Sequence, residues 1–265
     1  MDSLDQNALN KDALDRPTLR IHTLGTIPYE DTLAAMQHFT NSRSGATADE
    51  CWILEHPPVF TQGLAGKPEH VLQSSTIPIV QSDRGGQVTY HGPGQLVVYW
   101  LCDLRRMNSG PKAFVHALEE GAIQTLNTLN IPSERMDNAP GVYVHQRKIA
   151  SLGLRVRHGC TYHGISVNVD MDLAPFKQIN PCGYAGLAMT QIADEWAKDS
   201  KALSADDISS IATTLVLNTA SQLGYDASQI EWAQTAPASL PNAAVLSNPA
   251  LSVSYSRNMA EETKS

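Results

Sequence analysis

Two residues in the stretch 141–186 have types and surroundings that suggest nucleophilic chemistry. Cys182 lies in NPCGYAG, between Pro181 and Gly183, in a segment with few apolar residues. Such a turn exposes a side chain and lets a substrate approach the backbone closely. Lys148 lies in KIASLG, among residues that favour β-strands. We expect Cys182 and Lys148 to meet in space and to form a thiolate nucleophile.

The chemical reason for this pairing is the pKa of a thiol. A free thiol with a pKa of about 8.5 is only a few per cent thiolate at neutral pH. Lowering the pKa to about 7 requires about 2 kcal/mol of differential stabilisation. One ammonium at contact distance in a partly buried site can supply that energy. From spacing alone, an inert turn cysteine and a solvated strand lysine are the commoner outcomes.

The other three cysteines suggest structural roles or none. Cys51 in CWILE and Cys102 in YWLCDL fit small buried hydrophobic residues, whereas Cys160 in HGCTYHG is ambiguous. The four cysteines are widely spaced and too few for a disulfide scaffold, and their spacing argues against a zinc site. We therefore expect reduced thiols in a cytoplasmic protein that needs no metal and no other cofactor.

A glycine-rich stretch, RGGQVTYHGPGQ over residues 84–95, gives a second signal. Its glycines let a narrow ligand run along the backbone, although a hairpin without a ligand has the same composition. Neither glycine pattern that cradles phosphates is present, and no G-x-S-x-G motif supports a serine nucleophile. His91 could act as a base, but a lone histidine is more often structural.

The elements that must position these residues follow from periodicity and turn signals. Strands are expected over 18–23, 51–55, 77–80 and the second half of 82–104, and three antiparallel strands within 141–169. Residues 59–75 are expected to form a loop with one short helical turn. Helices are expected over 29–43, 111–130 and from Ser204, where Ser204 and Asp207 form a capping pattern. The order predicts an α+β protein with a mixed or antiparallel sheet and flanking helices.

Bulk composition limits the partners and the domain organisation. The chain has 265 residues and a net charge of −8, which argues against nucleic-acid binding. The longest apolar run, over 96–102, is too short to span a bilayer, so we expect a soluble protein with no membrane contact. We expect a disordered arm over 1–17, a catalytic domain over 18–226 and a loosely ordered tail over 227–265.

Five sequence blocks, in order along the chain, carry a family resemblance. They are EHPPVFTQG (55–63), RGGQVTYHGPGQLVVY (84–99), KIASLG (148–153), HGISVNV (163–169) and INPCGYAG (179–186). Together they resemble the lipoyl(octanoyl) transferases, the octanoyl-[acyl-carrier-protein]:protein N-octanoyltransferases. The resemblance extends over about residues 18–224.

The resemblance implies a fold shared with lipoate and biotin protein ligases, a Cys182 that carries the acyl group as a thioester, and a Lys148 that lowers the thiol pKa. It implies octanoyl transfer from octanoyl-acyl-carrier protein to a lysine of lipoyl domains, the first step of endogenous lipoate synthesis. Those domains belong to 2-oxoacid dehydrogenase E2 subunits and the glycine cleavage H protein. The implied substrate-lining residues are Arg84, Gly85, Gly86, Gln87, Val88, Thr89, Tyr90, His91, Ser151, Leu152, Gly153, Gly164, Ile165 and Ser166.

Two alternatives stay open from the sequence. One is an ATP-dependent lipoate or biotin ligase on the same fold, and the other is a non-catalytic module that binds an acyl-carrier protein. Two finer expectations concern the site itself. Backbone N–H groups near Gly183 are candidates for an oxyanion hole. Arg147, Arg155 and Arg157 are candidates for a positive patch that receives an acidic carrier protein.

Overall fold

The computed structural model describes residues 18–73, 75–196 and 203–240, except for the side chain of Cys182. The expected arm over 1–17 and the last part of the expected tail lie outside these ranges. The α-helices are α2 (Tyr29–Ser42), α3 (Pro111–Thr128), α4 (Ile192–Glu195) and α5 (Ala205–Gln222). The 3₁₀ helices are η1 (Pro68–His70), η2 (Ala174–Gln178), η3 (Pro181–Gly183) and η4 (Ala227–Gln229).

The strands form one large sheet and one small sheet. They are β1 (Leu19–Thr26), β2 (Asp49–Glu55), β3 (Val59–Gln62), β4 (Ile79–Gln81), β5 (Val88–His91), β6 (Gln95–Leu101), β7 (Glu134–Met136), β8 (Ala139–Val144), β9 (Arg147–Arg157), β10 (Cys160–Asn168) and β11 (Ile230–Trp232). The large sheet has the order β11-β1-β2-β6-β10-β9-β8-β7, and the small sheet has the order β4-β3-β5. Strand β1 pairs in parallel with β2 and β11, whereas β6, β10, β9, β8 and β7 are antiparallel to their neighbours. The expected mixed sheet with flanking helices is therefore confirmed.

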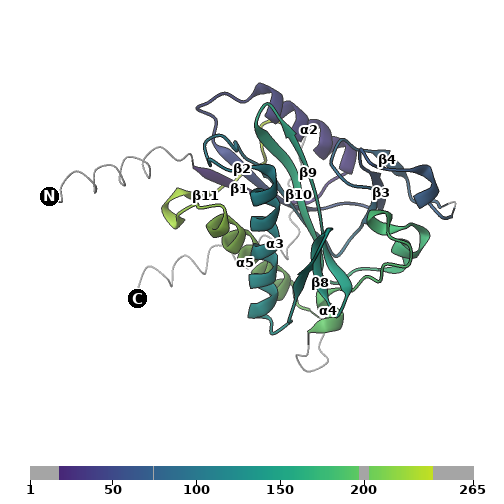
Figure 1. Ribbon diagram of the computed structural model, residues 1–265. Coiled ribbons are helices and arrows are strands. Elements are labelled where there is room, and N and C mark those ends of the chain that lie inside the picture. The colour runs from purple at the N-terminus through teal and green to yellow at the C-terminus, as the bar shows by residue number, and fades with distance from the viewer. Residues whose placement is uncertain (1–17, 74, 197–202, 241–265) are drawn as a thin grey trace.

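Helices cover both faces of the large sheet because its strands alternate between two apolar faces. Ile21 and Ile53 face a core cluster that includes apolar residues of α3 and α5. Trp52 and Leu54 face the opposite way, into a cluster with Met36 of α2. Figure 1 shows α3 and α5 side by side, with the small sheet near α2 at the other side of the molecule. Within the described ranges, no helix is long and apolar enough to cross a membrane.

Local signals predicted most elements, and the small sheet shows where they failed. The expected loop over 59–75 begins instead with strand β3, and β5 lies inside the expected glycine-rich loop. Val59 and Phe60 are buried because β3 pairs with β4 and β5, which are distant in sequence. The short helical turn expected after them is η1. The capping pattern of Ser204 and Asp207 is present at the start of α5.

The body of the protein continues past the boundary expected at residue 226. Strand β11 extends the large sheet in parallel with β1, and the Ala233 N–H donates to the Ile21 carbonyl oxygen at 2.8 Å. His22 Nδ1 lies 2.8 Å from the Thr235 carbonyl oxygen, and Leu240 is buried against the cluster beneath α2. The first part of the expected tail, 227–240, is thus packed on the sheet.

Candidate active site

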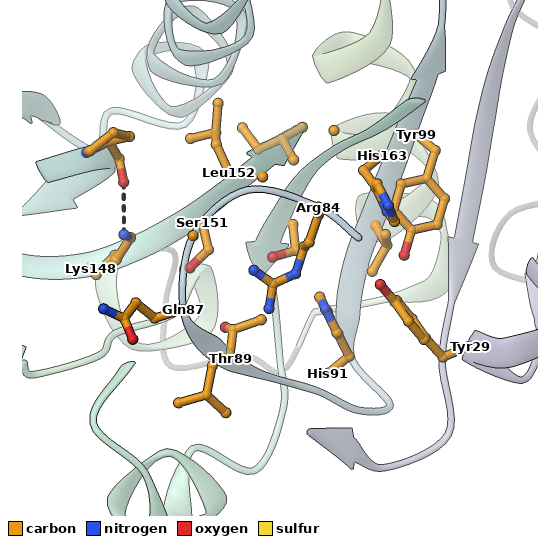
Figure 2. A pocket seen from close by; sticks show the side chains of 18 of the residues that line it. Tyr29, Arg84, Gln87, Thr89, His91, Tyr99, Lys148, Ser151, Leu152 and His163 are labelled. Carbon is orange, nitrogen blue, oxygen red and sulfur yellow. Dashed lines mark hydrogen bonds between the residues drawn. The ribbon is translucent and has the colours of Figure 1, made fainter. Parts of the chain in front are cut away.

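A cavity of about 170 Å³ lies where β5 and the loop before it meet β9 and β10. A cavity of about 150 Å³ accommodates a molecule the size of benzene, so this volume suits a small apolar group. The sequence-predicted residues that line it are Arg84, Gly86, Gln87, Val88, Thr89, His91, Lys148, Ser151, Leu152, Gly153, Gly164, Ile165 and Ser166. Elements far apart in sequence therefore bring the predicted substrate segments to one place (Figure 2).

Two of the predicted lining residues do not line the cavity. The Gly85 N–H donates to the Leu154 carbonyl oxygen at 2.9 Å, which ties the loop to β9. Tyr90 packs on Phe60 and Phe176, because successive side chains of a strand point to opposite faces. Both residues thus help to position the cavity wall without lining the cavity.

Sequence reasoning missed several residues of the cavity wall. They are Tyr29, Val97, Tyr99, Ala139, Pro140, His163 and Tyr184. His163 opens the HGISVNV block and Tyr99 closes the RGGQVTYHGPGQLVVY block, so both carried a signal that went unused. Tyr184 lies in the INPCGYAG block and carried the same kind of signal. Tyr29 and Pro140 carried none, because only the tertiary fold brings α2 and β8 to this cavity.

Lys148 is buried in the cavity wall, with an exposed fraction of 1%. Its Nζ donates a hydrogen bond of 2.8 Å to the Pro140 carbonyl oxygen, drawn as the dashed line in Figure 2. The ammonium also lies 5.4 Å from the centre of the Tyr143 ring, within the range of a cation–π contact. The surroundings therefore hold a cation at one end of the cavity.

The backbone of Lys148 is joined to the segment that follows the cysteine turn. Its N–H donates to the Ala188 carbonyl oxygen at 2.8 Å, and its carbonyl oxygen accepts from the Thr190 N–H at 3.0 Å. This parallel bridge fixes the chain only a few residues after η3, the turn that contains Cys182. Lys148 and the turn are thus held to one another through the backbone.

The turn η3 uses its own backbone donors. The Gly183 N–H donates to the Asn180 carbonyl oxygen at 2.9 Å, and the Tyr184 N–H donates to the Pro181 carbonyl oxygen at 3.1 Å. The expectation that N–H groups near Gly183 form an oxyanion hole is therefore not met by these two groups. Gly183 has a φ of +81°, which favours glycine.

The end of the cavity away from Lys148 is polar (Figure 2). Tyr29 and His91 are stacked with ring centres 5.9 Å apart, and His91 Nδ1 donates to Gln95 Oε1 at 2.7 Å. Arg84 reaches between them and Ser151, and its Nη2 donates to the Thr61 carbonyl oxygen at 2.6 Å. Burial holds the pKa of His91 well below its usual value, so its ring is neutral.

His163 belongs to the same polar end and is held by an acidic residue. Its Nε2 lies 2.9 Å from Asp83 Oδ1, and the Tyr162 hydroxyl donates to Oδ2 of the same carboxylate. Burial lowers the pKa of His163, and the hydrogen bond to Asp83 opposes that effect only in part. Nε2 therefore carries the proton of a neutral ring. Its φ of +63° is uncommon for a residue with a side chain.

The cysteines whose side chains are described are unsuited to be nucleophiles. Cys51, Cys102 and Cys160 are free and buried. Burial raises the pKa of the Cys51 and Cys102 thiols well above the usual value and also raises that of Cys160. The expectation that Cys51 and Cys102 are buried hydrophobic residues is confirmed, and Cys182 remains the candidate nucleophile. Among the described residues, no cluster of His, Cys, Asp or Glu could hold a metal ion.

Comparison with known proteins identifies the family. Residues 28–214 match the model of the lipoyl protein ligase A/B catalytic domain. An octanoyltransferase of Pseudomonas fluorescens is 58% identical over 177 residues, which are 67% of this chain and 82% of that protein. An octanoyltransferase of Cellvibrio japonicus is 53% identical over 210 residues, which are 79% and 95% of the two chains.

This chain belongs to the lipoyl(octanoyl) transferase family. It is an acyltransferase enzyme, as its sequence predicted. Among solved structures, the bipartite lipoate protein ligase of Thermoplasma acidophilum is similar with a TM-score of 0.64 and 14% identity, over 84% of this chain and 89% of that one. A lipoate-protein ligase A bound with ATP gives the same TM-score and identity, with 84% and 90% covered. At this identity the likeness shows the fold, which agrees with the expected lipoate-ligase architecture.

Proposed function

We propose that this enzyme transfers an octanoyl group from octanoyl-acyl-carrier protein to a lysine of lipoyl domains, through a thioester at Cys182. The acceptors proposed are the lipoyl domains of 2-oxoacid dehydrogenase E2 subunits and the glycine cleavage H protein, and the proposed compartment is the cytoplasm. The octanoyltransferases of Pseudomonas fluorescens and Cellvibrio japonicus support octanoyl as the group transferred. The observation that carries the mechanism is the buried ammonium of Lys148, tied by its backbone to the segment after the Cys182 turn.

In the first half-reaction the Cys182 thiolate attacks the thioester carbonyl carbon of the octanoyl carrier. A new carbon–sulfur bond forms, the bond to the phosphopantetheine sulfur breaks, and the carrier leaves as a thiolate that takes up a proton. The Lys148 ammonium favours the attacking thiolate electrostatically. An ammonium in a partly buried site can provide the roughly 2 kcal/mol needed to bring a thiol pKa from about 8.5 to about 7.

In the second half-reaction the neutral amine of the acceptor lysine attacks the Cys182 thioester. An amide bond forms, the amine loses a proton, and Cys182 leaves as a thiolate ready for the next cycle. Covalent catalysis of this kind divides one transfer between two large proteins into two simpler steps. Conversion of a thioester to an amide is favourable in free energy. The proposed steps therefore require no ATP and no metal.

Apolar residues in the cavity wall support an acyl substrate. Val97, Leu152 and Ile165 are among the residues that line the cavity. An aliphatic chain buried there would gain roughly 0.8 kcal/mol per methylene group removed from water.

The experiment that tests this function compares acyl transfer with and without ATP. Purified enzyme, octanoyl-acyl-carrier protein and a lipoyl domain should give an octanoylated domain at the same rate in both reactions. Enzyme and carrier alone should give an octanoyl adduct that peptide mapping places on Cys182, and Cys182→Ala should form neither adduct nor product.

Two outcomes would contradict the proposal. A strict need for ATP with free octanoate would indicate a ligase, and carrier binding without any acyl transfer would indicate a binding module. The matched control is Cys102→Ala, which removes a buried thiol outside the cavity and should keep transfer activity, with some loss of stability.

A further inference from the structure

Acyl transfer at Cys182 must pass through tetrahedral intermediates in which the acyl oxygen carries a negative charge. Enzymes stabilise such an oxyanion with hydrogen-bond donors that are fixed before the reaction begins. The two turn donors nearest Gly183 are already used, because the Gly183 and Tyr184 N–H groups bond to carbonyl oxygens within the turn. These two groups are therefore not free to face the reacting carbonyl group, and side chains next to the turn become candidate donors.

The side chain of Gln87 lies directly against this turn. A Cβ atom built on Gly183 would lie 3.0 Å from Gln87 Nε2 and 3.1 Å from Gln87 Cδ. Strand β5 and the turn η3 are in contact, and Gln87 itself lines the cavity. Figure 2 shows Gln87 beside Lys148, at the end of the cavity opposite the histidines. The carboxamide is thus placed where the turn meets the cavity.

The hydrogen bonding of Gln87 indicates that its carboxamide is not a structural anchor. Its Oε1 is buried and has no hydrogen-bond partner among the described residues. A buried polar atom without a partner costs about 1 to 3 kcal/mol, so its retention calls for an explanation. Unsatisfied polar groups that persist in a cavity are typical of functional sites.

We propose that Gln87 is a catalytic residue whose Nε2–H donates to the oxyanion formed on the octanoyl carbonyl at Cys182. This inference rests on the proposed function and deepens it by naming the oxyanion donor. As the Cys182 sulfur bonds to the carbonyl carbon, the π electrons move to oxygen and the Gln87 hydrogen bond shortens. When the oxyanion collapses, the bond to the leaving sulfur or the bond to Cys182 breaks, and Gln87 neither gains nor loses a proton.

This assignment separates the tasks of the two polar residues at this end of the cavity. Lys148 is a cation, and its proposed task is to favour the thiolate before attack. Gln87 is neutral, so removing its carboxamide leaves the charge around the thiol unchanged. The effect of its removal arises only in the step in which negative charge develops on the acyl oxygen. The pH dependence of thiol reactivity therefore distinguishes the two residues.

The test uses the full chain with octanoyl-acyl-carrier protein as substrate. Gln87→Met keeps the length and approximate volume of the side chain and removes the donor. The rate of octanoyl adduct formation on Cys182 in a single turnover, followed by intact mass, should fall by about 100-fold, as when other oxyanion donors are removed. The KM for the carrier and the midpoint of iodoacetamide alkylation against pH should stay the same.

Gln87→Glu provides a second variant in case the methionine does not fold, because it keeps the shape but replaces the donor with an acceptor. It should acylate at least as slowly as Gln87→Met. The matched control is Gln81→Met on the exposed strand β4, which lies outside the cavity and should acylate at the parent rate.

The proposal fails if a folded Gln87→Met enzyme acylates Cys182 within about threefold of the parent rate, a difference well below that of a lost oxyanion donor. It also fails if the midpoint of alkylation against pH moves far enough to account for the slower acylation. Gln87 would then act on the ionisation of the Cys182 thiol and not on the oxyanion. If the parent enzyme itself forms no adduct on Cys182, the proposed function fails and not the role of Gln87 alone.

Discussion

The side chain of Lys148 passes so close to Gly141 that a larger residue at position 141 would require the lysine side chain or the backbone at Ala150 to move. A Cβ on Gly141 would lie 2.5 Å from Cε and 3.0 Å from Nζ of Lys148. The N–H of Gly141 donates to Glu119 Oε1 at 2.9 Å, and Gly141 has a φ of +144°. The place of the ammonium in the cavity therefore depends on a glycine in the neighbouring strand β8.

Gly141→Ala should displace the Lys148 ammonium and slow acylation of Cys182 by at least about tenfold, the effect of roughly 1.4 kcal/mol in the barrier. Single-turnover acylation by octanoyl-acyl-carrier protein measures this effect. Gly110→Ala is the control, because a Cβ there would meet no atom within 4 Å. Equal rates for the two variants would show that the contact between Gly141 and Lys148 has no role in the reaction.

Lys148→Ala should raise the pKa of the Cys182 thiol, because the cation that favours the thiolate is lost. The rate of alkylation against pH should shift to higher pH, and acylation should recover in part above pH 8. Lys177→Ala removes an equal charge at an exposed position of helix η2 and should leave the midpoint in place. An unchanged midpoint in Lys148→Ala would contradict the pairing of Lys148 with Cys182.

Reversing Arg155 and Arg157 to Glu should raise the KM for octanoyl-acyl-carrier protein and flatten its salt dependence. Both residues lie on β9, at positions that continue the face of Ser151 and Gly153 in the cavity wall. Arg147, the third candidate, is instead paired with Glu195 at 2.7 Å.

Lys67→Glu with Lys112→Glu is the control, because it makes the same change of net charge on other surfaces. It should change the KM for the carrier by less than the arginine pair does, since charges near the docking site dominate encounter. Similar effects of the two double variants would indicate a response to net charge and not a docking site at β9.

Stability should fall as the pH falls from about 6.5 to 4, in part because His56 is buried as a neutral ring. Burial lowers its pKa to about 4, the hydrogen bond to the Ile27 carbonyl oxygen opposes this shift, and nearby His163 adds to it. The unfolded chain then binds more protons over this range, so acid favours unfolding. A shift of this size corresponds to about 3 kcal/mol.

Urea unfolding at pH 7 and pH 4 measures this dependence. His56→Gln should lose less stability between the two values than the parent, and His38→Asn, which changes an exposed histidine, should behave like the parent. If His56→Gln and the parent lost equal stability, His56 would not be a source of the acid sensitivity.

A chain that ends at Leu240 should keep its activity, whereas a chain that ends at residue 226 should lose stability. The longer chain retains β11 beside β1 and the buried Leu240 side chain. Removing a buried leucine alone costs about 2 to 5 kcal/mol. Thermal unfolding with an activity assay distinguishes the two chains, and equal melting temperatures would show that β11 does not stabilise the sheet.

The sequence by itself determined the features that depend on neighbours along the chain. The capping pattern of Ser204 and Asp207 predicted the start of α5, and Pro111 marked the start of α3. Alternating apolar residues predicted strands that became β8, β9 and β10. The blocks around Lys148 and Cys182 predicted the family, because their residue types and order can be read from the sequence without knowledge of the fold.

Only the tertiary structure decided which residues share the cavity. Tyr29 and Pro140 reach it from segments with no common pattern, and β11 joins the sheet more than 200 residues after its partner β1 begins. The backbone bonds of η3 also removed the Gly183 and Tyr184 N–H groups as oxyanion donors and left Gln87 beside the turn. These outcomes escape sequence reasoning because periodicity and turn signals report local preferences, whereas burial and hydrogen-bond partners are set by contacts between distant segments.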